Sequence, residues 1–489
     1  MAIIVLTIQS SIRHWAQRSP FSCALITPEK NYSWVDLQQQ VNQMTHHFMS
    51  QGVGKGDVVT LVGKNQPEML FAYLACCELG AIAALTMPQP YTNLTLKLSM
   101  LYHESQPRYL WCSRDVWLSF SEQERADIED RNQRLNVDSP AENTRLEALE
   151  ERKPSELASI VFTSGSTGQP KAVAHSFEQH FASAFGLLSV FDFGIKDTWL
   201  LSLPMYHVSG LAIVYRWLAA GGCLKVGTGD LKRDIQEVTH ASLVATQLRQ
   251  LIDSQQPLAL SRVLLGGSHI PSELGKMCAA KGIDTWLGYG MTEAASTVTA
   301  KPIDDIVSAG QVLPNRLLKI QNNRIFIGGK TLANGYFFQG KVTPLVDDTG
   351  WFDSKDLGHW VNDELKVIGR ADNQFISGGE NVHCEEIEEQ LNRHPLIMQS
   401  FVVPIEDDLF GHRPVAVIES TNLVGGEEQR QEFGHSMKIE LDEYLKSRLE
   451  KFKWPIRYYQ MPSDLKGTGI KVSRKELKQW LVNKIKMSG

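Results

Sequence analysis

One stretch constrains the fold and chemistry of this chain more than any other: residues 160–171, Ile-Val-Phe-Thr-Ser-Gly-Ser-Thr-Gly-Gln-Pro-Lys. The apolar run from Ala158 to Phe162 predicts a buried strand, which stops at a loop of hydroxyl residues and glycines. Glycines let a backbone approach an anion closely, and hydroxyls and bare N–H groups donate hydrogen bonds to it. Lys171 adds a positive charge for phosphate oxygens. The pattern predicts a phosphate-binding loop; a flexible surface loop is the plain alternative.

The order of residues differs from that of the nucleoside-triphosphatase P-loop, in which Gly-Lys-Ser/Thr follow in succession and open a helix. Here Gln169 and Pro170 separate the last glycine from Lys171. The stretch resembles instead the signature loop of the adenylate-forming superfamily, which includes acyl-CoA synthetases, peptide-synthetase adenylation domains and luciferases. In that superfamily the loop holds the β- and γ-phosphates of ATP. The resemblance implies that role here for Thr163, Ser164, Gly165, Ser166, Thr167, Gly168 and Lys171.

Length and composition permit a large enzyme: 489 residues, 43% of them hydrophobic, should form at least two domains. The net charge of −6 argues against extensive nucleic-acid binding, so anion sites must be local. The seven cysteines contain no C-x-x-C pair, and we expect reduced thiols in a cytoplasmic protein. No apolar stretch is long enough to span a bilayer, so we expect no stable membrane anchor.

Strand-like and helix-like segments alternate in the first third of the chain, which predicts the βα units of a layered sheet. Residues 310–360 read as β-rich. The predicted fold is α/β: a large N-terminal domain of layered, mostly parallel sheets plus a β-rich subdomain, and a small mobile C-terminal α+β domain. The resemblance implies a hinge at Asp372 that divides residues 1–371 from residues 372–489.

A predicted strand ends at Pro204, and His207 follows it ahead of an apolar helix, 208–219. Open α/β sheets bind ligands at the carboxyl ends of their strands, although a lone histidine is more often structural. His207 matches the proline–aromatic–histidine motif of the superfamily, in which the histidine borders the carboxylate substrate. Two further strands are predicted at 241–247 and 262–268. The second ends in Gly-Gly, and the resemblance implies that this segment, with Gly267, contacts the adenine.

The segment from Trp286 to Glu293 matches the superfamily motif Tyr-Gly-x-Thr-Glu. The match implies that Tyr289 stacks on adenine and that Thr292 bonds the α-phosphate. It also implies that Glu293 holds Mg²⁺, which prefers carboxylate and phosphate oxygens. From the residues alone, the same segment reads as a capped helix start with an acid in its first turn.

Residues 350–356 align with a superfamily segment ending in Gly-Asp, whose aspartate accepts hydrogen bonds from both ribose hydroxyls. The resemblance assigns that role to Asp356, although Lys355 stands where the glycine is usual. It implies that Arg370 reaches the ribose or a phosphate. It also implies that the loop with Gly378 and Gly379 faces the active site while the thioester forms.

Near its end the superfamily carries a Gly-Lys-x-x-Arg motif with a catalytic lysine. Here Ile470 separates Gly469 from Lys471, but the Lys-x-x-Arg spacing is intact. We therefore expect Lys471 to be the catalytic lysine, with Lys466 as its rival. The catalytic residues implied are Lys471, His207, Thr292 and Glu293.

Within the superfamily, local sequence resembles the 2-succinylbenzoate–CoA ligases of menaquinone biosynthesis, mainly over residues 160–475. That acid is an aromatic dicarboxylate, so its pocket needs polar groups for the carboxylate that is not activated. The sequence leaves the role of Arg216 open. The candidates for the substrate pocket are His207, Ser209, Thr246, Gln247, Ser268, Gly290 and Ser296.

The resemblance implies an enzyme that uses ATP, Mg²⁺ and coenzyme A, with a small-molecule acid as its substrate. Another aryl- or fatty-acid–CoA ligase, or a stand-alone adenylation domain that loads a carrier protein, is the alternative within the superfamily. A non-catalytic nucleotide-binding protein is a further alternative, but it would not need Lys471 in addition to Lys171. A homo-oligomer is possible.

Overall fold

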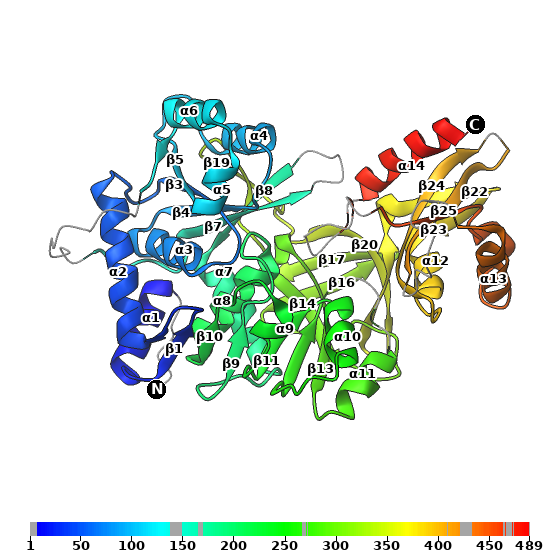
Figure 1. Ribbon diagram of the computed structural model, residues 1–489, viewed down its shortest axis with the longest axis horizontal. Helices are drawn as coiled ribbons and strands as arrows, with labels where there is room; N and C mark the ends of the chain where they lie inside the picture. The colour runs from blue at the N-terminus through cyan, green and yellow to red at the C-terminus, as the bar shows by residue number, and fades with distance from the viewer. Residues whose placement is uncertain are drawn as a thin grey trace.

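The computed structural model of the chain describes residues 7–136, 149–164, 170–266, 270, 272–407, 409–420, 433–462, 465, 472 and 474–488. Two large sheets lie next to each other in the N-terminal part, and a smaller sheet with its own helices lies at the C-terminal end (Figure 1). The α/β fold class predicted from the sequence is confirmed. The division at Asp372 stays a prediction.

The first sheet contains the strand predicted at 158–162, which extends over β7. Its order is β19-β18-β8-β7-β4-β3-β5-β6; the strands from β6 to β7 are parallel, and the pairs from β7 to β19 are antiparallel. Leu157–Ser164 and Pro170–Ser176 thus form a hairpin around the predicted phosphate loop. The strands are β3 (Val58–Val62), β4 (Ile82–Thr86), β5 (Tyr109–Cys112), β6 (Gln133–Arg134), β7 (Leu157–Ser164), β8 (Pro170–Ser176), β18 (Gly335–Phe338) and β19 (Lys341–Pro344).

The second sheet has the order β15-β14-β13-β12-β11-β9-β10-β1-β2. Its central pairs are parallel, whereas β14 turns back antiparallel to β13. The strands are β1 (Cys23–Ile26), β2 (Asn31–Ser33), β9 (Thr198–Leu200), β10 (Cys223–Lys225), β11 (His240–Leu243), β12 (Arg262–Leu265), β13 (Asp284–Met291), β14 (Ser296–Pro302) and β15 (Gln311–Val312).

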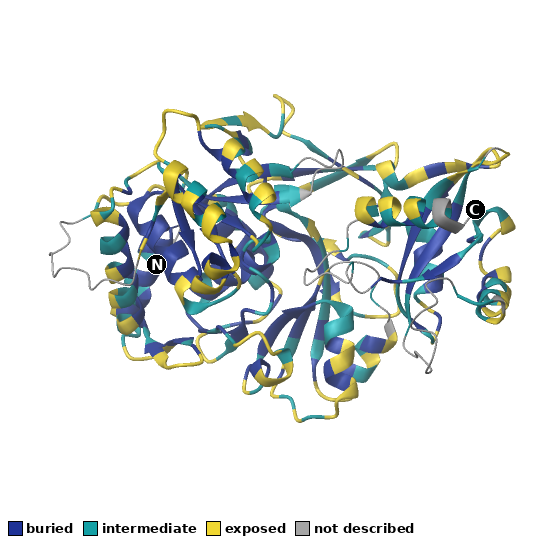
Figure 2. Cartoon of the chain, turned by 45° about the horizontal axis from the view of Figure 1, so that its top comes forward, coloured by how far each residue is buried: buried dark blue, intermediate teal, exposed yellow. Residues whose placement is uncertain are grey.

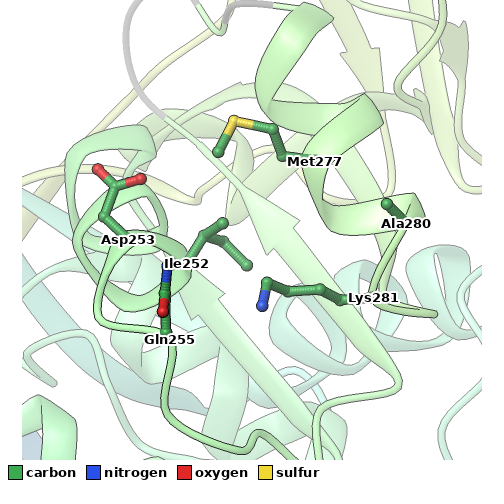
Figure 3. Close-up of a pocket in the computed structure, with 6 residues that line it drawn as sticks. All are labelled: Ile252, Asp253, Gln255, Met277, Ala280 and Lys281. Atoms are coloured by element: carbon green, nitrogen blue, oxygen red, sulfur yellow. The ribbon is translucent and has the colours of Figure 1, made fainter.

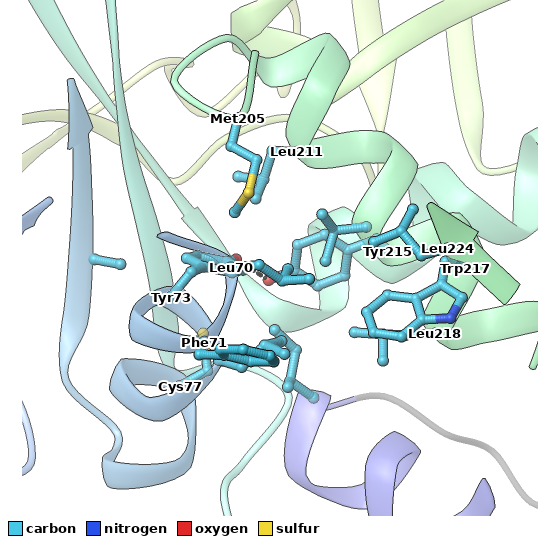
Figure 4. Close-up of a cluster of buried hydrophobic side chains, with 14 of the residues drawn as sticks. Leu70, Phe71, Tyr73, Cys77, Met205, Leu211, Tyr215, Trp217, Leu218 and Leu224 are labelled. Atoms are coloured by element: carbon cyan, nitrogen blue, oxygen red, sulfur yellow. Dashed lines mark hydrogen bonds between the residues drawn. The ribbon is translucent and has the colours of Figure 1, made fainter. Parts of the chain in front are cut away.

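The main hydrophobic core lies between these two sheets, where helices α3 (Pro67–Leu79) and α8 (Val208–Ala220) are buried on almost all sides. Both helices are apolar all round, as interior helices are. Figure 4 shows Tyr73 of α3 and Tyr215 of α8 meeting in this core, and Figure 2 shows the buried layer between exposed outer helices. The other helices of this part are α1 (Ile8–Arg18), α2 (Trp34–Ser50), α4 (Tyr91–Leu101), α5 (Arg114–Ser119), α6 (Glu122–Arg131), α7 (Phe177–Leu188), α9 (Leu231–Asp234), α10 (Ala245–Asp253) and α11 (Ser272–Ala279).

The remaining strands form two smaller sheets. The predicted β-rich region, 310–360, supplies β16, β17 and nearly all of β20 to a four-stranded antiparallel sheet that β21 completes. The C-terminal sheet has α12 and α13 packed on one face and α14 on the other. Among the described helices, none is long and apolar enough to cross a membrane. The elements are β16 (Arg316–Gln321), β17 (Arg324–Gly329), β20 (Phe352–Val361), β21 (Glu364–Arg370), β22 (Gln374–Ser377), β23 (Glu380–His383), α12 (Cys384–Leu391), β24 (Ile397–Asp407), β25 (Gly411–Ser420), α13 (His435–Lys446), β26 (Tyr458–Gln460) and α14 (Arg474–Ser488).

Candidate active site

One hairpin, β13–β14, carries five of the predicted site residues: Tyr289, Gly290, Thr292, Glu293 and Ser296. A single 3-10 turn, Thr292–Ala294, joins its strands. The chain then reverses through Ala295 and Ser296, whose φ values are 50° and 90°. The helix start expected here is therefore wrong, because the reversal leads directly into β14. Gly290 lies so close to β14 that an added Cβ would be 1.9 Å from the Ser296 carbonyl oxygen.

The Glu293 carboxylate contacts Tyr336 of the neighbouring sheet, and Tyr336 in turn contacts Lys171. The Tyr336 hydroxyl donates to Glu293 Oε1 at 3.2 Å, and Lys171 Nζ lies 4.7 Å from the centroid of the Tyr336 ring. Lys171 belongs to β8 and Tyr336 to β18, two strands that pair with each other. Burial and then the Glu293 charge raise the pKa of Tyr336, so its hydroxyl stays protonated and donates. The fold thus brings a lysine, a tyrosine and a carboxylate together from three segments distant in sequence.

Four residues form what we term the carboxylate cluster: Tyr289, Asp356, Arg370 and Asp372. Asp356, only 7% exposed, accepts from the Tyr289 hydroxyl at 2.6 Å and from Arg370 Nη1 at 3.2 Å. Arg370 also donates to both carboxylate oxygens of Asp372, at 2.8 and 3.1 Å. Burial and the Asp356 charge raise the pKa of Tyr289, which keeps that phenol protonated. The structure therefore brings together three predicted nucleotide-binding residues, Tyr289, Asp356 and Arg370, and the predicted hinge residue.

Lys355 precedes this cluster with a φ of 65°, in the region that favours glycine. Two local hydrogen bonds hold the turn. The Lys355 N–H donates to Asp353 Oδ1 at 3.0 Å, and the Asp356 N–H donates to Ser354 Oγ at 3.0 Å. The glycine usual in the superfamily suits this conformation, and the chain reaches it here without one.

His207 is the residue that precedes helix α8, and Ser209 lies in the first turn of that helix. The strand before it ends sooner than Pro204, at Leu200 of β9, and the intervening loop is held by Asn65. Asn65 Nδ2 donates to the carbonyl oxygens of Leu201 and Leu203 at 2.9 and 2.8 Å. No sequence signal distinguished Asn65 from an ordinary residue before a helix.

Thr246 and Gln247 lie in helix α10 and not at the end of a strand, because β11 ends at Leu243. The predicted strand was too long because the polar residues after Val244 begin a helix. Gln247 Oε1 accepts from the Val244 N–H at 3.1 Å, and this bond caps the new helix. Whether either side chain contacts the acid stays a prediction.

Arg216 lies in the core beside the β13–β14 hairpin. It is 1% exposed, and its Nη2 donates to Thr297 Oγ1 at 3.1 Å. Its Nε has no hydrogen-bond partner, and within the described ranges no carboxylate pairs with it. Burial, and then the charge of Arg316, lower the pKa of Arg216 to about 9, which still leaves it charged at neutral pH. The apolar helix gave no sign of which way this side chain points.

His175 was not predicted as a site residue. It is fully buried in β8, and its Nε2 donates to the Thr292 carbonyl oxygen at 2.8 Å. A lone histidine in an apolar strand carries no functional signal in the sequence. Its contact with the turn between β13 and β14 becomes visible only in the fold.

Gly378 and Gly379 form the two-residue turn between β22 and β23, with φ values of 61° and 90°. Such turns require positive φ at both positions, which explains both glycines. Figure 1 places this hairpin in the C-terminal part, with β24 and β25. The predicted site residues outside the described ranges are Gly165, Ser166, Thr167, Gly168, Gly267, Ser268 and Lys471.

A surface pocket of about 670 Å³ lies between the C-terminal ends of α10 and α11 (Figure 3). Its lining includes Gln255, Met277 and Lys281, none of which is a predicted site residue. Thr246 and Gln247 lie at the other end of α10. The pocket is therefore distinct from the converging residues described above.

A family model described as AMP-binding enzyme matches residues 12–337. A 2-succinylbenzoate–CoA ligase from Salmonella typhimurium is 39% identical over 486 residues, which cover 97% of this chain and 98% of that protein. A variant of E. coli MenE with bound OSB-AMS superposes with a TM-score of 0.85 at 35% identity, over 98% of this chain and 99% of that chain.

Two structures of the o-succinylbenzoate CoA synthetase (MenE) from Bacillus subtilis are similar at 27% identity. The complex with the acyl-adenylate intermediate OSB-AMP has a TM-score of 0.80 and covers 96% of this chain and 97% of that chain. The complex with ATP and magnesium ion has a TM-score of 0.77 and covers 92% and 95%. The chain belongs to the family of AMP-binding enzymes, as these similarities over nearly its whole length show.

Proposed function

We propose that the chain is an AMP-forming acid–thiol ligase for 2-succinylbenzoate. It joins the acid to AMP and then transfers the acyl group to coenzyme A, which yields 2-succinylbenzoyl-CoA, AMP and pyrophosphate in menaquinone biosynthesis. The support is the full-length similarity to ligases of that name, together with a site that gathers charged and polar groups suited to a nucleotide and a dicarboxylate.

The chemistry requires cations and hydrogen-bond donors more than a nucleophilic side chain. A free carboxylate acylates poorly because its leaving group would be oxide. In the first step a carboxylate oxygen attacks the α-phosphorus of ATP, the bond to the bridging oxygen breaks, and pyrophosphate leaves with the electron pair. Negative charge then crowds one place, so positioning and fixed positive charge supply most of the rate enhancement.

At the phosphate end, Lys171 and Glu293 act together. Lys171 lies at the start of β8, next to the phosphate loop, and can pair with phosphate oxygens. Mg²⁺ in such sites takes one or two carboxylates and completes its shell with phosphate oxygens and water. Glu293 supplies one carboxylate, and the described residues contain no group of three acids, histidines or cysteines that would cage a metal alone. When bound, Mg²⁺ neutralises phosphate charge.

At the nucleoside end, the carboxylate cluster offers Asp356 to the ribose. Both of its oxygens already accept hydrogen bonds, from Tyr289 and Arg370, so the carboxylate is held in one orientation. A carboxylate oxygen has two acceptor positions, and each can accept from a ribose hydroxyl as well. We assign the Tyr289 ring to stacking on adenine, and Thr292, which follows on the same hairpin, to the α-phosphate.

One observation favours a dicarboxylate over other acids: Arg216 is a buried guanidinium with an unused N–H and no carboxylate partner in the described ranges. A buried charge without a counter-ion is costly, and a carboxylate brought by the substrate would remove that cost. Arg216 lies against Thr297, one residue beyond Ser296. We assign the carboxylate that is not activated to this side of the hairpin, with His207 and Ser209 near the activated one.

The second half-reaction relies on the C-terminal part by resemblance. Lys471 is assigned to adenylation, and the turn with Gly378 and Gly379 to the thioester-forming state, with Asp372 as the hinge between them. Coenzyme A supplies a thiolate that attacks the acyl carbonyl, and AMP leaves. The cytoplasmic location and a possible homo-oligomer stay predictions.

The test is exchange of labelled pyrophosphate into ATP with 2-succinylbenzoate and with two matched monoacids, 4-oxo-4-phenylbutanoate and 2-butanoylbenzoate. Each monoacid keeps one of the two carboxylates. The monoacid that keeps the activated carboxylate loses one charge-assisted contact of about 1.5–3 kcal/mol, so its kcat/KM should fall by about 10- to 150-fold. The other monoacid lacks the reacting carboxylate and should support no exchange. Exchange that is equally fast with a monoacid would favour an aryl-acid ligase instead. Rejection of coenzyme A by an active adenylating protein would favour a carrier-loading domain.

A further inference from the structure

The turn between β13 and β14 holds an unfavourable backbone conformation. Ala295 and Ser296 are consecutive non-glycine residues with φ values of 50° and 90°. Such conformations are unfavourable for non-glycine residues and persist only where the surroundings determine them. This turn presents Thr292 and Glu293, the residues assigned to the α-phosphate and to Mg²⁺.

Four carbonyl groups in and after this turn accept hydrogen bonds from four separate segments. His175 Nε2 donates to Thr292 O at 2.8 Å, and Ser183 Oγ donates to Ala295 O at 2.5 Å. The other two donors come from segments later in the chain: Ala333 N–H to Glu293 O at 2.9 Å and Arg316 Nε to Thr297 O at 2.9 Å. The turn is therefore fixed through its backbone, and none of these four bonds uses the side chains of Thr292 and Glu293.

Among these donors, His175 bonds the residue that is itself assigned to the phosphate. Because a carbonyl oxygen only accepts, the proton must be on Nε2, and Nδ1 has no partner among the described residues. The ring lies 4.8 Å from that of His180, which stacks on Tyr215 at 4.3 Å. These ring contacts and the hydrogen bond orient the His175 imidazole, with its Nε2–H directed at the Thr292 carbonyl oxygen.

We propose that His175 is a positioning residue for adenylation: its Nε2–H fixes the Thr292 carbonyl, and through it the Thr292 hydroxyl and the Glu293 carboxylate toward the phosphates of ATP. The proposal rests on the proposed function. It assigns no proton transfer to His175, which touches the backbone of the site and not the reacting atoms.

The chain offers a matched control in His180. Both histidines are fully or almost fully buried and their rings are adjacent, but His180 Nε2 bonds Ser159 Oγ at 2.8 Å instead of the turn. Three variants separate the roles: His175→Met removes the donor at similar volume, His175→Gln offers an amide N–H in place of Nε2–H, and His180→Met removes a neighbouring histidine only.

The readouts are kcat and KM for ATP in pyrophosphate exchange, the Mg²⁺ dependence of that exchange, and thioester formation from supplied acyl-adenylate. A misplacement of about 1 Å can cost about 100-fold in rate, so His175→Met should lower exchange kcat by about 30- to 100-fold. His175→Gln should recover about tenfold of that loss, since it keeps a donor. The rate of thioester formation from supplied acyl-adenylate should change far less in the folded variant, because the turn is assigned to positioning the phosphates of ATP.

His180→Met should lower the unfolding midpoint as His175→Met does but leave exchange kcat nearly unchanged. Equal losses of exchange in His175→Met and His180→Met, or no recovery in His175→Gln, would overturn the proposal. If His175→Met does not fold, Ser183→Ala removes a second side-chain donor, the one to the Ala295 carbonyl, and should weaken the same half-reaction selectively. Absence of exchange in the unmodified protein would instead refute the proposed function, so the two failures are distinguishable.

Discussion

The β13–β14 hairpin contacts two polar groups of opposite character. On one side is the carboxylate cluster, in which Arg370 and Asp372 are each more than a third exposed at their side chains. On the other side is what we term the neutral column: Tyr73, His175, His180 and Tyr215, all buried. The column is linked by the 2.7 Å bond between the Tyr73 and Tyr215 hydroxyls (Figure 4) and by stacked rings.

The difference shows how one hairpin can offer a ligand-binding side and a side that packs in the core. Partly solvated charges can change partners at low cost, which suits the side that must accept a ribose. A buried charge without an ideal partner costs several kcal/mol, and the neutral column offers the turn an uncharged donor, whereas Arg216 and Arg316 are buried charges that donate to Thr297. We therefore expect changes in the carboxylate cluster to alter catalysis, and changes in the neutral column to alter stability, with His175 as the residue that does both.

The largest expected effect is that of Asp356→Asn. The amide cannot accept from both ribose hydroxyls as a carboxylate does. Losing two charge-assisted bonds of about 1.5–3 kcal/mol each should lower kcat/KM for ATP by about 100-fold or more. Pyrophosphate exchange measures this. Asp353→Asn, three residues earlier on β20, is the control, because Asp353 pairs with Arg324 and not with the cluster. Equal losses in both variants would show that the strand, and not the Asp356 carboxylate, is what matters.

Acidification should destabilise the neutral column. Burial lowers the pKa of His175 from 6.5 to about 4, and burial lowers that of His180 as well. His175 therefore becomes protonated below pH 6.5 in the unfolded chain but only near pH 4 in the folded chain. The free energy of unfolding consequently decreases as the pH falls through that window. His175 alone should account for about 2 kcal/mol between pH 7 and pH 5.

Urea unfolding of the unmodified protein and of His175→Gln at both pH values isolates this contribution. Glutamine does not titrate, so the destabilisation caused by the substitution should shrink by about 2 kcal/mol at pH 5. Carboxylates elsewhere affect both proteins alike. Parallel pH profiles for the two proteins would mean that His175 is already accessible to protons in the folded chain.

The tyrosine pair should show a smaller effect. Tyr73→Phe or Tyr215→Phe leaves the other hydroxyl buried without its partner, at a cost of about 1–3 kcal/mol in unfolding free energy. The double variant removes both hydroxyls and should cost less than the sum of the single variants. A double-mutant cycle by urea unfolding measures the coupling. Additive losses would show that the two hydroxyls do not depend on each other.

The sequence predicted much of this arrangement because its elements obey local rules. The apolar run before the phosphate loop became β7, and the helix expected at 208–219 is α8. The motif residues Tyr289, Thr292 and Glu293 lie on one hairpin, and the roles that the resemblance gives them stay predictions. Where prediction failed, a local alternative was equally good: the polar residues after Val244 suit a strand end, yet Gln247 caps a helix.

The residues that prediction missed act through contacts between distant segments. His175 bonds Thr292 across 117 positions, and Asn65 bonds Leu201 across 136. Arg216 lies on a helix that is apolar on all sides, so no hydrophobic face revealed its direction. Periodicity and motif spacing report on neighbours along the chain, and none of these three residues acts on its neighbours.

Lys355→Gly should have the smallest effect and tests whether the carboxylate cluster tolerates change beside it. A residue with a side chain costs about 1–2 kcal/mol of stability at a φ of 65°. Glycine avoids this cost, but it also gives the unfolded chain more conformational freedom, which offsets part of the gain. We expect a gain of about 1 kcal/mol or less in unfolding free energy, with exchange activity unchanged because the Asp356 bonds do not involve the lysine side chain. Lys319→Gly, in a strand, should destabilise instead. A loss of activity in Lys355→Gly without a loss of stability would place the lysine charge in nucleotide binding, and the cluster would then extend one residue further toward solvent.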